Sequence, residues 1–183
     1  MIGNKILLAS ICTLFLSACG GSSDDTIVYA VSVPSQPEYF DTAVFNDTLP
    51  LNAKATGKDG PDTRANGIAG FSHRFGTQYE LEISRTETEI NGTYAPVYRL
   101  ISVISEKRDE VGTVYTFPNV HLYSRPIYID ASGKYRFSPY EFLCAENIDC
   151  DALVNIADSG GIVSIEFTLT DSETVPITLT SWR

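Results

Sequence analysis

The chain has 183 residues, of which 43% are hydrophobic, 11% aromatic and 20% charged, and its formal net charge at pH 7 is −10. This length is enough for one domain with a normal buried core, or for two small halves that pack closely. The excess of acidic residues argues against partners such as nucleic acid or an anionic lipid surface, and its simplest role is solubility.

The N-terminal segment has the layout of a lipoprotein signal peptide. Lys5 precedes an apolar run over residues 6–16, which is shorter than the roughly 20 residues that span a bilayer. The run ends in Leu16-Ser17-Ala18-Cys19, a lipobox, in which small residues fit the peptidase cleft before the cysteine. We therefore expect residues 1–18 to be cleaved and Cys19 to carry a diacylglyceryl group; a signal peptide without lipidation is the alternative.

A Gly- and Ser-rich stretch follows the lipobox, and residues 19–26 are expected to be a flexible tether. The lipid bilayer is then a partner through acylated Cys19, because two or three acyl chains hold a protein firmly. Gly20 follows the cysteine, where an Asp tends to retain lipoproteins in the inner membrane. The expected location is the bacterial cell envelope, with the outer membrane favoured where two membranes are present.

The next predicted elements are strands separated by turns. Residues 26–33 are β-branched and aromatic and predict a strand, and residues 34–37 a turn. Residues 46–67 are rich in Asn, Asp, Gly and Pro, which predicts a long surface loop. Alternation predicts a strand over 78–86, Asn91-Gly92 predicts a hairpin turn, and residues 96–105, apolar on both faces, predict a central strand.

The second half of the chain predicts short strands at 111–117, 121–124, 126–129 and 135–137, then one or two turns of helix within 139–156. Val163, Ile165, Phe167 and Leu169 alternate with polar residues opposite Ile177 and Leu179, which predicts a closing hairpin. The fold class is therefore all-β and mainly antiparallel, a sandwich or partly open barrel with at most one or two short helices. We expect a single domain over residues 27–183, with two intimate halves, 27–108 and 109–183, as the alternative.

Two of the four cysteines remain for the folded part, because Cys12 leaves with the signal peptide and Cys19 is lipidated. An exported pair such as Cys144 and Cys150 is normally a disulfide. A redox pair is more often spaced C-x-x-C, and a zinc site needs more ligands than His73 and His121 supply. No metal or cofactor is expected.

Residues 67–107 carry a pattern that resembles a small bacterial domain of unknown function, found in exported lipoproteins and often beside META (HslJ-like) domains. The pattern is Gly70-Phe71, Gly76 and Tyr79-Glu80-Leu81-Glu82-Ile83, followed by Tyr98-Arg99-Leu100, Val103 and Lys107. The resemblance covers about a quarter of the chain and implies a β-rich envelope lipoprotein. It implies no catalytic residues, since that family has none assigned.

Residues 115–142 hold eight aromatic side chains interleaved with Arg125, Lys134 and Arg136. Tyr and Arg dominate binding hot spots, although strands also favour aromatics for packing. If the chain binds something, the expected face contains these five residues: Tyr123, Arg125, Tyr128, Tyr135 and Arg136. Its cations would attract an acidic glycan or an acidic partner surface.

No nucleophile, metalloprotease or phosphate-loop motif occurs, and the histidines are expected to be structural rather than catalytic. The expected function is a membrane-anchored envelope lipoprotein that acts as a non-catalytic binding or structural module for an envelope protein or a glycan, and not as an enzyme. One alternative is an inhibitor or accessory lipoprotein that uses the Cys144–Cys150 loop. Another is a cell-wall or glycan hydrolase, which needs a pocket with His73 or His121 beside a carboxylate.

Overall fold

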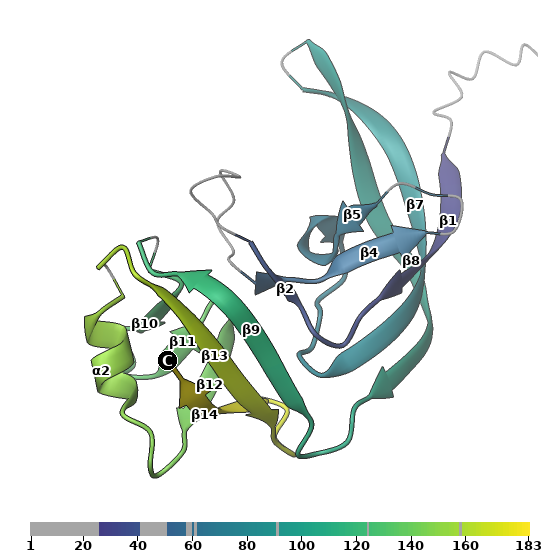
Figure 1. Ribbon diagram of the computed structural model, residues 1–183. Helices are drawn as coiled ribbons and strands as arrows, with labels where there is room; N and C mark the ends of the chain where they lie inside the picture. Colours follow the sequence, from purple (N-terminus) through teal and green to yellow (C-terminus); the bar gives the residue numbers. More distant parts are fainter. Residues whose placement is uncertain are drawn as a thin grey trace, which may run out of the picture.

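The computed structural model describes residues 26–40, 51–57, 60, 62–90, 92–123, 125–157 and 159–183 (Figure 1). The predicted signal peptide, Cys19 and most of the predicted tether lie outside the described residues. Within them the regular secondary structure is mostly β, arranged in two six-stranded sheets and one two-stranded sheet, with one short α-helix and one 3₁₀ turn. The predicted all-β, mainly antiparallel class is confirmed.

The first sheet contains only strands from the first half of the chain, and Figure 1 shows it beside the second sheet. Its strand order is β5-β4-β1-β7-β8-β6. The bounds are β1 Ile27–Val33, β4 Lys54–Gly57, β5 Thr63–Arg64, β6 Ile68–Ala69, β7 Thr77–Ile90 and β8 Thr93–Arg108. The two long strands β7 and β8 form a hairpin whose tip extends beyond the rest of the sheet (Figure 1).

Alternation explains which face of the first sheet is buried. Val31 and Val33 of β1 lie on the same face as Tyr79, Leu81 and Ile83 of β7, because these strands pair antiparallel in register. All five side chains are buried in one core cluster, which Tyr98, Ile68 and three alanines complete. The strands predicted at 26–33 and 78–86 are therefore confirmed.

Strand β8 differs from the central strand that its two apolar faces predict. Its pairing with β7 shifts register twice, and Ile101 and Ile104 fall at these shifts without a partner across the ladder. On its other side β8 pairs with β6 at only Tyr98 and Arg99. Ile101 and Ile104 are largely exposed, and so is Val103, which pairs with Leu81, so both faces of this end of β8 lack a covering layer among the described residues.

The second sheet contains the second half of the chain, in the order β10-β11-β12-β14-β13-β9. The bounds are β9 Val114–His121, β10 Ile127–Ile129, β11 Tyr135–Phe137, β12 Tyr140–Cys144, β13 Ile162–Leu169 and β14 Ile177–Trp182. The predicted closing hairpin is β13–β14, and the six predicted side chains are all buried. Strand β14 is internal, since it pairs antiparallel with β13 and parallel with β12.

The long surface loop predicted over residues 46–67 is wrong for its second part. This stretch forms the short strand β3 Leu51–Asn52, paired with β2 Glu38–Tyr39, then β4, β5 and the 3₁₀ turn η1 Ala65–Gly67. Leu51, Ala53 and Ala55 are fully buried. Breaker residues dominate the composition there, but the apolar residues at alternate positions pack into the cores, Leu51 into that of the second sheet and the two alanines into that of the first.

The helix predicted within residues 139–156 is present only as α2 Cys150–Asn155. The first part of that range forms β12 instead, and Leu143 lies on its exposed face rather than in a buried helical stripe. The helix begins at Asp149, whose carboxylate accepts a hydrogen bond from the backbone N–H of Ala152 at 2.8 Å. No helix among the described residues has the length and apolar character to cross a membrane.

Candidate functional site

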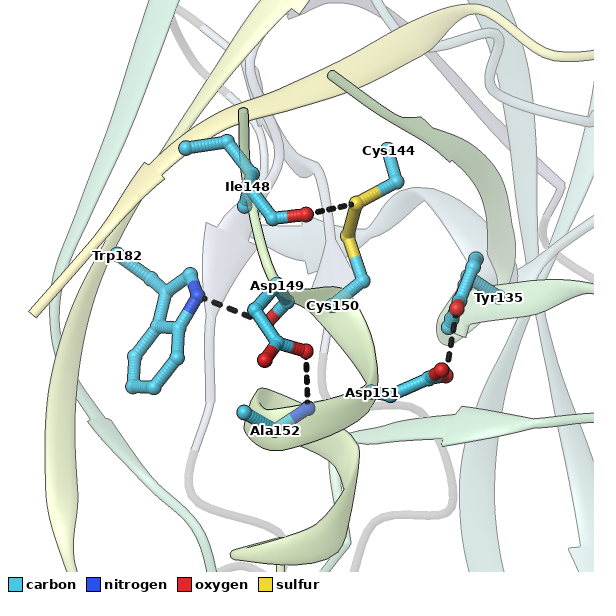
Figure 2. The surroundings of a disulfide bond; sticks show 8 residues. All are labelled: Tyr135, Cys144, Ile148, Asp149, Cys150, Asp151, Ala152 and Trp182. Carbon is cyan, nitrogen blue, oxygen red and sulfur yellow. Dashed lines mark hydrogen bonds between the residues drawn. A yellow bond between two sulfur atoms is a disulfide. The ribbon is translucent and has the colours of Figure 1, made fainter. Parts of the chain in front are cut away.

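The predicted disulfide between Cys144 and Cys150 is present and joins the end of β12 to the start of α2 (Figure 2). The carbonyl oxygen of Ile148 lies 3.0 Å from the sulfur of Cys144. The indole N–H of Trp182 donates to the carbonyl of Asp149 at 3.2 Å, which ties this loop to the last strand. The disulfide therefore fixes a short loop at the edge of the second core.

The aromatic segment 115–142 divides between core and surface. Tyr115, Phe117, Phe137 and Phe142 are buried and belong to the second core. The hydroxyl of Tyr115 donates to Asp109 at 2.7 Å, and burial raises the pKa of this phenol. Tyr135 and Tyr140 pack against the same core while partly exposed, so packing accounts for most of the aromatic side chains in this segment, as strand preference predicts.

The five predicted binding residues do not converge on one site. Tyr123 and Tyr128 are exposed, and Arg125 lines a shallow cleft of about 310 Å³ between Tyr128 and α2. The hydroxyl of Tyr135 instead donates to Asp151 at 2.6 Å, and its ring stacks on buried Phe142. Tyr135 is therefore a packing residue with a polar tip.

The cations of this segment meet acidic side chains of the same sheet. The Nε of Arg136 donates to Asp130 at 2.8 Å, and Lys134 lies 3.0 Å from Glu141. Hydrogen bonds from Ser132 and Arg136 hold the pKa of the Asp130 carboxyl well below its usual range. A basic patch for an acidic partner does not form at Arg136, because these neighbouring carboxylates compensate its charge.

Another site lies where two chain segments cross between the two cores. In the first segment Leu51 packs in the second core, while Ala53 packs in the first. In the second segment Phe71 packs against the first core, while Phe75 belongs to the second. The middle residue of each crossing, Asn52 or His73, therefore lies at the junction of the sheets.

A groove of about 420 Å³ opens at this junction, and both middle residues line it. Its described wall consists of Leu51, Asn52, Asn66, Phe71, Ser72, His73, Pro139 and Tyr140. The backbone N–H of Leu51 donates to the carbonyl of Ser138 at 3.1 Å, so a hydrogen bond between the two halves fixes one side. Well-formed concave sites with a few polar groups are the usual places for ligands.

His73 fixes the other side of the groove through both ring nitrogens. Its Nε2 lies 2.8 Å from the carbonyl oxygen of Pro34, and its Nδ1 lies 2.7 Å from the hydroxyl of Tyr140. A neutral ring that donates from Nε2 and accepts at Nδ1 satisfies both contacts. Burial lowers the pKa of His73, while its hydrogen bond to Pro34 acts in the opposite direction.

The hydroxyl of Tyr140 completes this arrangement as a donor to the imidazole. Burial raises the pKa of Tyr140, so the phenol keeps its proton. The ring of Tyr140 meets Phe75 edge-on with centroids 5.1 Å apart. The pair of His73 and Tyr140 therefore connects the first half of the chain to strand β12 of the second sheet.

His73 also borders a smaller cleft of about 160 Å³ that contains Glu141 and Glu173. Each carboxylate faces a cation: Glu141 lies 3.5 Å from Arg136, and Glu173 lies 3.8 Å from Arg74. The two nitrogens of His73 already have the other partners described above. His121 lies at the end of β9 with its ring against Tyr123, 5.8 Å between centroids.

The sequence did not single out most of the groove. Asn52 and Asn66 lie in the stretch predicted to be a surface loop, and Tyr140 was one of eight similar aromatics. Among the described residues, no group of three or more His, Cys, Asp or Glu side chains is placed to hold a metal ion. The available signal was Leu51-Asn52-Ala53, a polar residue between two apolar ones after a proline.

Comparisons of the chain with protein-family models, with curated proteins and with solved structures found no match.

Proposed function

We propose that this protein is a lipid-anchored lipoprotein of the bacterial envelope whose folded part binds a partner without catalysing a reaction. The observation that carries the binding role is the junction groove, with its aromatic rings, two amides and a hydroxyl. Ligand sites are typically concave and mostly apolar, with a few fixed polar groups. Both crossing segments are anchored in the two cores, so the wall of the groove is preorganised.

The anchor rests on the lipobox that ends at Cys19. Strand β1 begins at Ile27, and 27 − 19 = 8 Cα-to-Cα steps separate it from the cysteine. An extended chain covers at most about 3.6 Å per residue, so this tether would keep the folded part within about 30 Å of the bilayer. The disulfide supports an exported location, because such bonds persist in oxidising compartments.

The non-catalytic role is supported by the state of His73. General bases need a free nitrogen within reach of a substrate proton, but both nitrogens of this ring serve contacts between segments. The carboxylates beside it are ion-paired with arginines. This arrangement favours a structural imidazole over the hydrolase alternative.

The anchor is tested by the variant Cys19→Ala. We expect it to lose labelling by a fatty-acid analogue and to leave the membrane fraction, whereas the matched variant Cys12→Ala keeps both. A Cys19→Ala protein that still labels and still sediments with membranes would rule out the lipobox.

The binding role is tested by a photo-cross-linking amino acid at Ser72, on the wall of the groove, in intact cells. We expect a cross-linked partner that is absent when the same amino acid stands at exposed Thr88 on the β7–β8 hairpin. Equal products from both positions would mean that the groove is not the binding surface.

The inhibitor or accessory alternative is supported by the loop between Cys144 and Cys150. Besides the disulfide, the N–H of Ala145 donates to the carbonyl of Leu179 at 3.1 Å, and Trp182 holds Asp149. Its exposed tip has a fixed shape that suits insertion into a partner's cleft. Cross-linking from Asn147 in place of Ser72 would favour this function.

A further inference from the structure

One residue of the junction groove buries a hydrogen-bond donor that has no acceptor among the described residues. Asn52 is only 4% exposed, and its Nδ2 is buried without a hydrogen-bond partner. Among the described residues, Thr77 and Arg85 also bury an unpartnered side-chain atom, but neither lines this groove. Most buried polar groups in proteins are hydrogen-bonded, so such an exception calls for an explanation.

The orientation of the Asn52 amide follows from its neighbour. The backbone N–H of Asn66 donates to Oδ1 of Asn52 over a long contact of 3.4 Å. Turning the amide over would place Nδ2 against that N–H, two donors facing each other, so Oδ1 has to remain there. The N–H₂ group of Asn52 therefore has no acceptor among the described residues, and because this group is buried, a ligand in the groove reaches it only when the wall at Asn52 shifts slightly.

The residue types in the wall of the groove limit the kind of ligand that can supply this acceptor. The described lining has no Asp, Glu, Lys or Arg, and burial keeps His73 neutral by lowering its pKa. A charged ligand would lose its hydration in the groove and would find no opposite charge in the described lining. The free-energy cost of leaving water is smaller for an uncharged ligand with several polar atoms, because the amides of Asn52 and Asn66 and the hydroxyl of Ser72 can replace hydrogen bonds to water.

The rings in the wall add an apolar surface to these polar groups. Phe71 and Tyr140 line the groove together with Pro139 and Leu51. A sugar ring combines hydroxyl or acetamido oxygens on its rim with apolar C–H groups on its face. This combination matches a wall of amides and aromatic rings. An extended peptide fits less well, because it binds by pairing with a free strand edge, and none of the described strands that border the groove has a long one.

We propose that the junction groove binds a neutral glycan, with Nδ2 of Asn52 donating to a hydroxyl or acetamido oxygen of one sugar residue. Phe71 and Tyr140 supply the surface against which the sugar face packs. This proposal rests on the proposed function, in that it names the ligand class for the same groove.

The test measures binding of two neutral probes, the trimer of N-acetylglucosamine and cellotriose, to the full chain in detergent by calorimetry. The variant Asn52→Leu keeps the size of the side chain and removes the unpaired amide. We expect at least one probe to bind the unaltered protein and the variant to bind at least tenfold more weakly. We also expect the variant to unfold at nearly the same temperature, because removing the buried unpartnered donor offsets the loss of the long hydrogen bond from the N–H of Asn66.

Asn155→Leu on α2 is the matched control, because the same substitution there changes a cleft of the second sheet instead. It should leave binding unchanged. Binding of the unaltered protein should also change less than twofold between 50 and 500 mM salt, as expected for an uncharged ligand.

Three results would overturn the proposal: no binding of either probe at millimolar concentration, equal binding by Asn52→Leu, or strong salt dependence. Asn52-dependent binding of an uncharged acetylated tripeptide, with no sugar bound, would make the groove a peptide site instead. Failure with glycans while Ser72 still cross-links a partner would remove the ligand class and leave the proposed function standing.

Discussion

Gly76 occupies a position where the fold tolerates no side chain. Its φ is +75°, in the left-handed region that favours glycine, and a Cβ there would lie 2.4 Å from Cδ1 of Leu169. Its N–H donates to the carbonyl of Ser35 at 2.9 Å, and its carbonyl accepts from the N–H of Asp109 at 2.8 Å. Gly76 thus fixes the backbone where the first sheet contacts the core of the second.

The variant Gly76→Ala should destabilise the protein by about 2–4 kcal/mol. A left-handed φ costs an alanine about 1–2 kcal/mol, partly offset by the smaller entropy of its unfolded chain. The new methyl lies about 1 Å inside the shortest ordinary contact with Leu169, a fully buried residue, and such overpacking costs about 1–3 kcal/mol.

Urea denaturation of a protein that begins at Thr26 measures this cost. Gly133→Ala is the matched control, because Gly133 has a φ of +81° and nothing within 4 Å of its added Cβ. It should lose about 1 kcal/mol or less from strain alone. The double variant Gly76→Ala, Leu169→Ala should cost less than the sum of its single variants, because the shorter side chain removes the clash. Equal losses for Gly76→Ala and Gly133→Ala would refute the overpacking argument.

Two further predictions concern the disulfide and His73. Replacing both Cys144 and Cys150 with Ala should lower the free energy of unfolding by about 2–2.5 kcal/mol through loop entropy, or the melting temperature by about 4–10 °C; unaltered protein that melts at the same temperature with and without reductant would contradict this. Burial lowers the pKa of His73 in the folded protein below its value of about 6.5 in the unfolded chain. Between these two pKa values the unfolded state binds more protons, so the free energy of unfolding should fall as the pH drops below about 6.5. The slope is at most about 1.4 kcal/mol per pH unit. The variant His73→Gln should lack this pH-dependent loss, whereas the titration of carboxylates should affect the variant and the unaltered protein alike. If the free energies of unfolding of the two proteins run parallel from pH 7.5 to 5, His73 contributes nothing to the pH dependence.

Strand existence was largely predictable, because side chains of a half-buried strand alternate with a period of two. The pattern Val163, Ile165, Phe167, Leu169 therefore located both β13 and its buried face. The same logic located β8, which lies between β7 and β6, but misjudged its burial, since Ile101, Val103 and Ile104 are all exposed where no other described layer covers the strand. It also missed β3 and β4, where the alternating residues are mostly alanines within a turn-rich composition.

The candidate site was much less predictable than the strands. The disulfide followed from the two cysteines that remain after the expected cleavage and lipidation, and the lipobox at Cys19 stays a prediction because it lies outside the described residues. Among the predicted binding residues, Tyr123 and Tyr128 are exposed as expected. Tyr135 and Arg136 are held by contacts within the second sheet, which depend on the pairing of β10, β11 and β12.

The sequence by itself determined the β-rich class, the closing hairpin and the disulfide, because each depends on local alternation or on a pair of residues close in the chain. Only the tertiary structure decided the junction groove. Asn52, His73 and Tyr140 are far apart in sequence and meet because two segments cross from one core to the other. The burial of the Asn52 amide and the lowered pKa of His73 arise from that crossing, since burial is a property of the packed sheets and not of any local pattern.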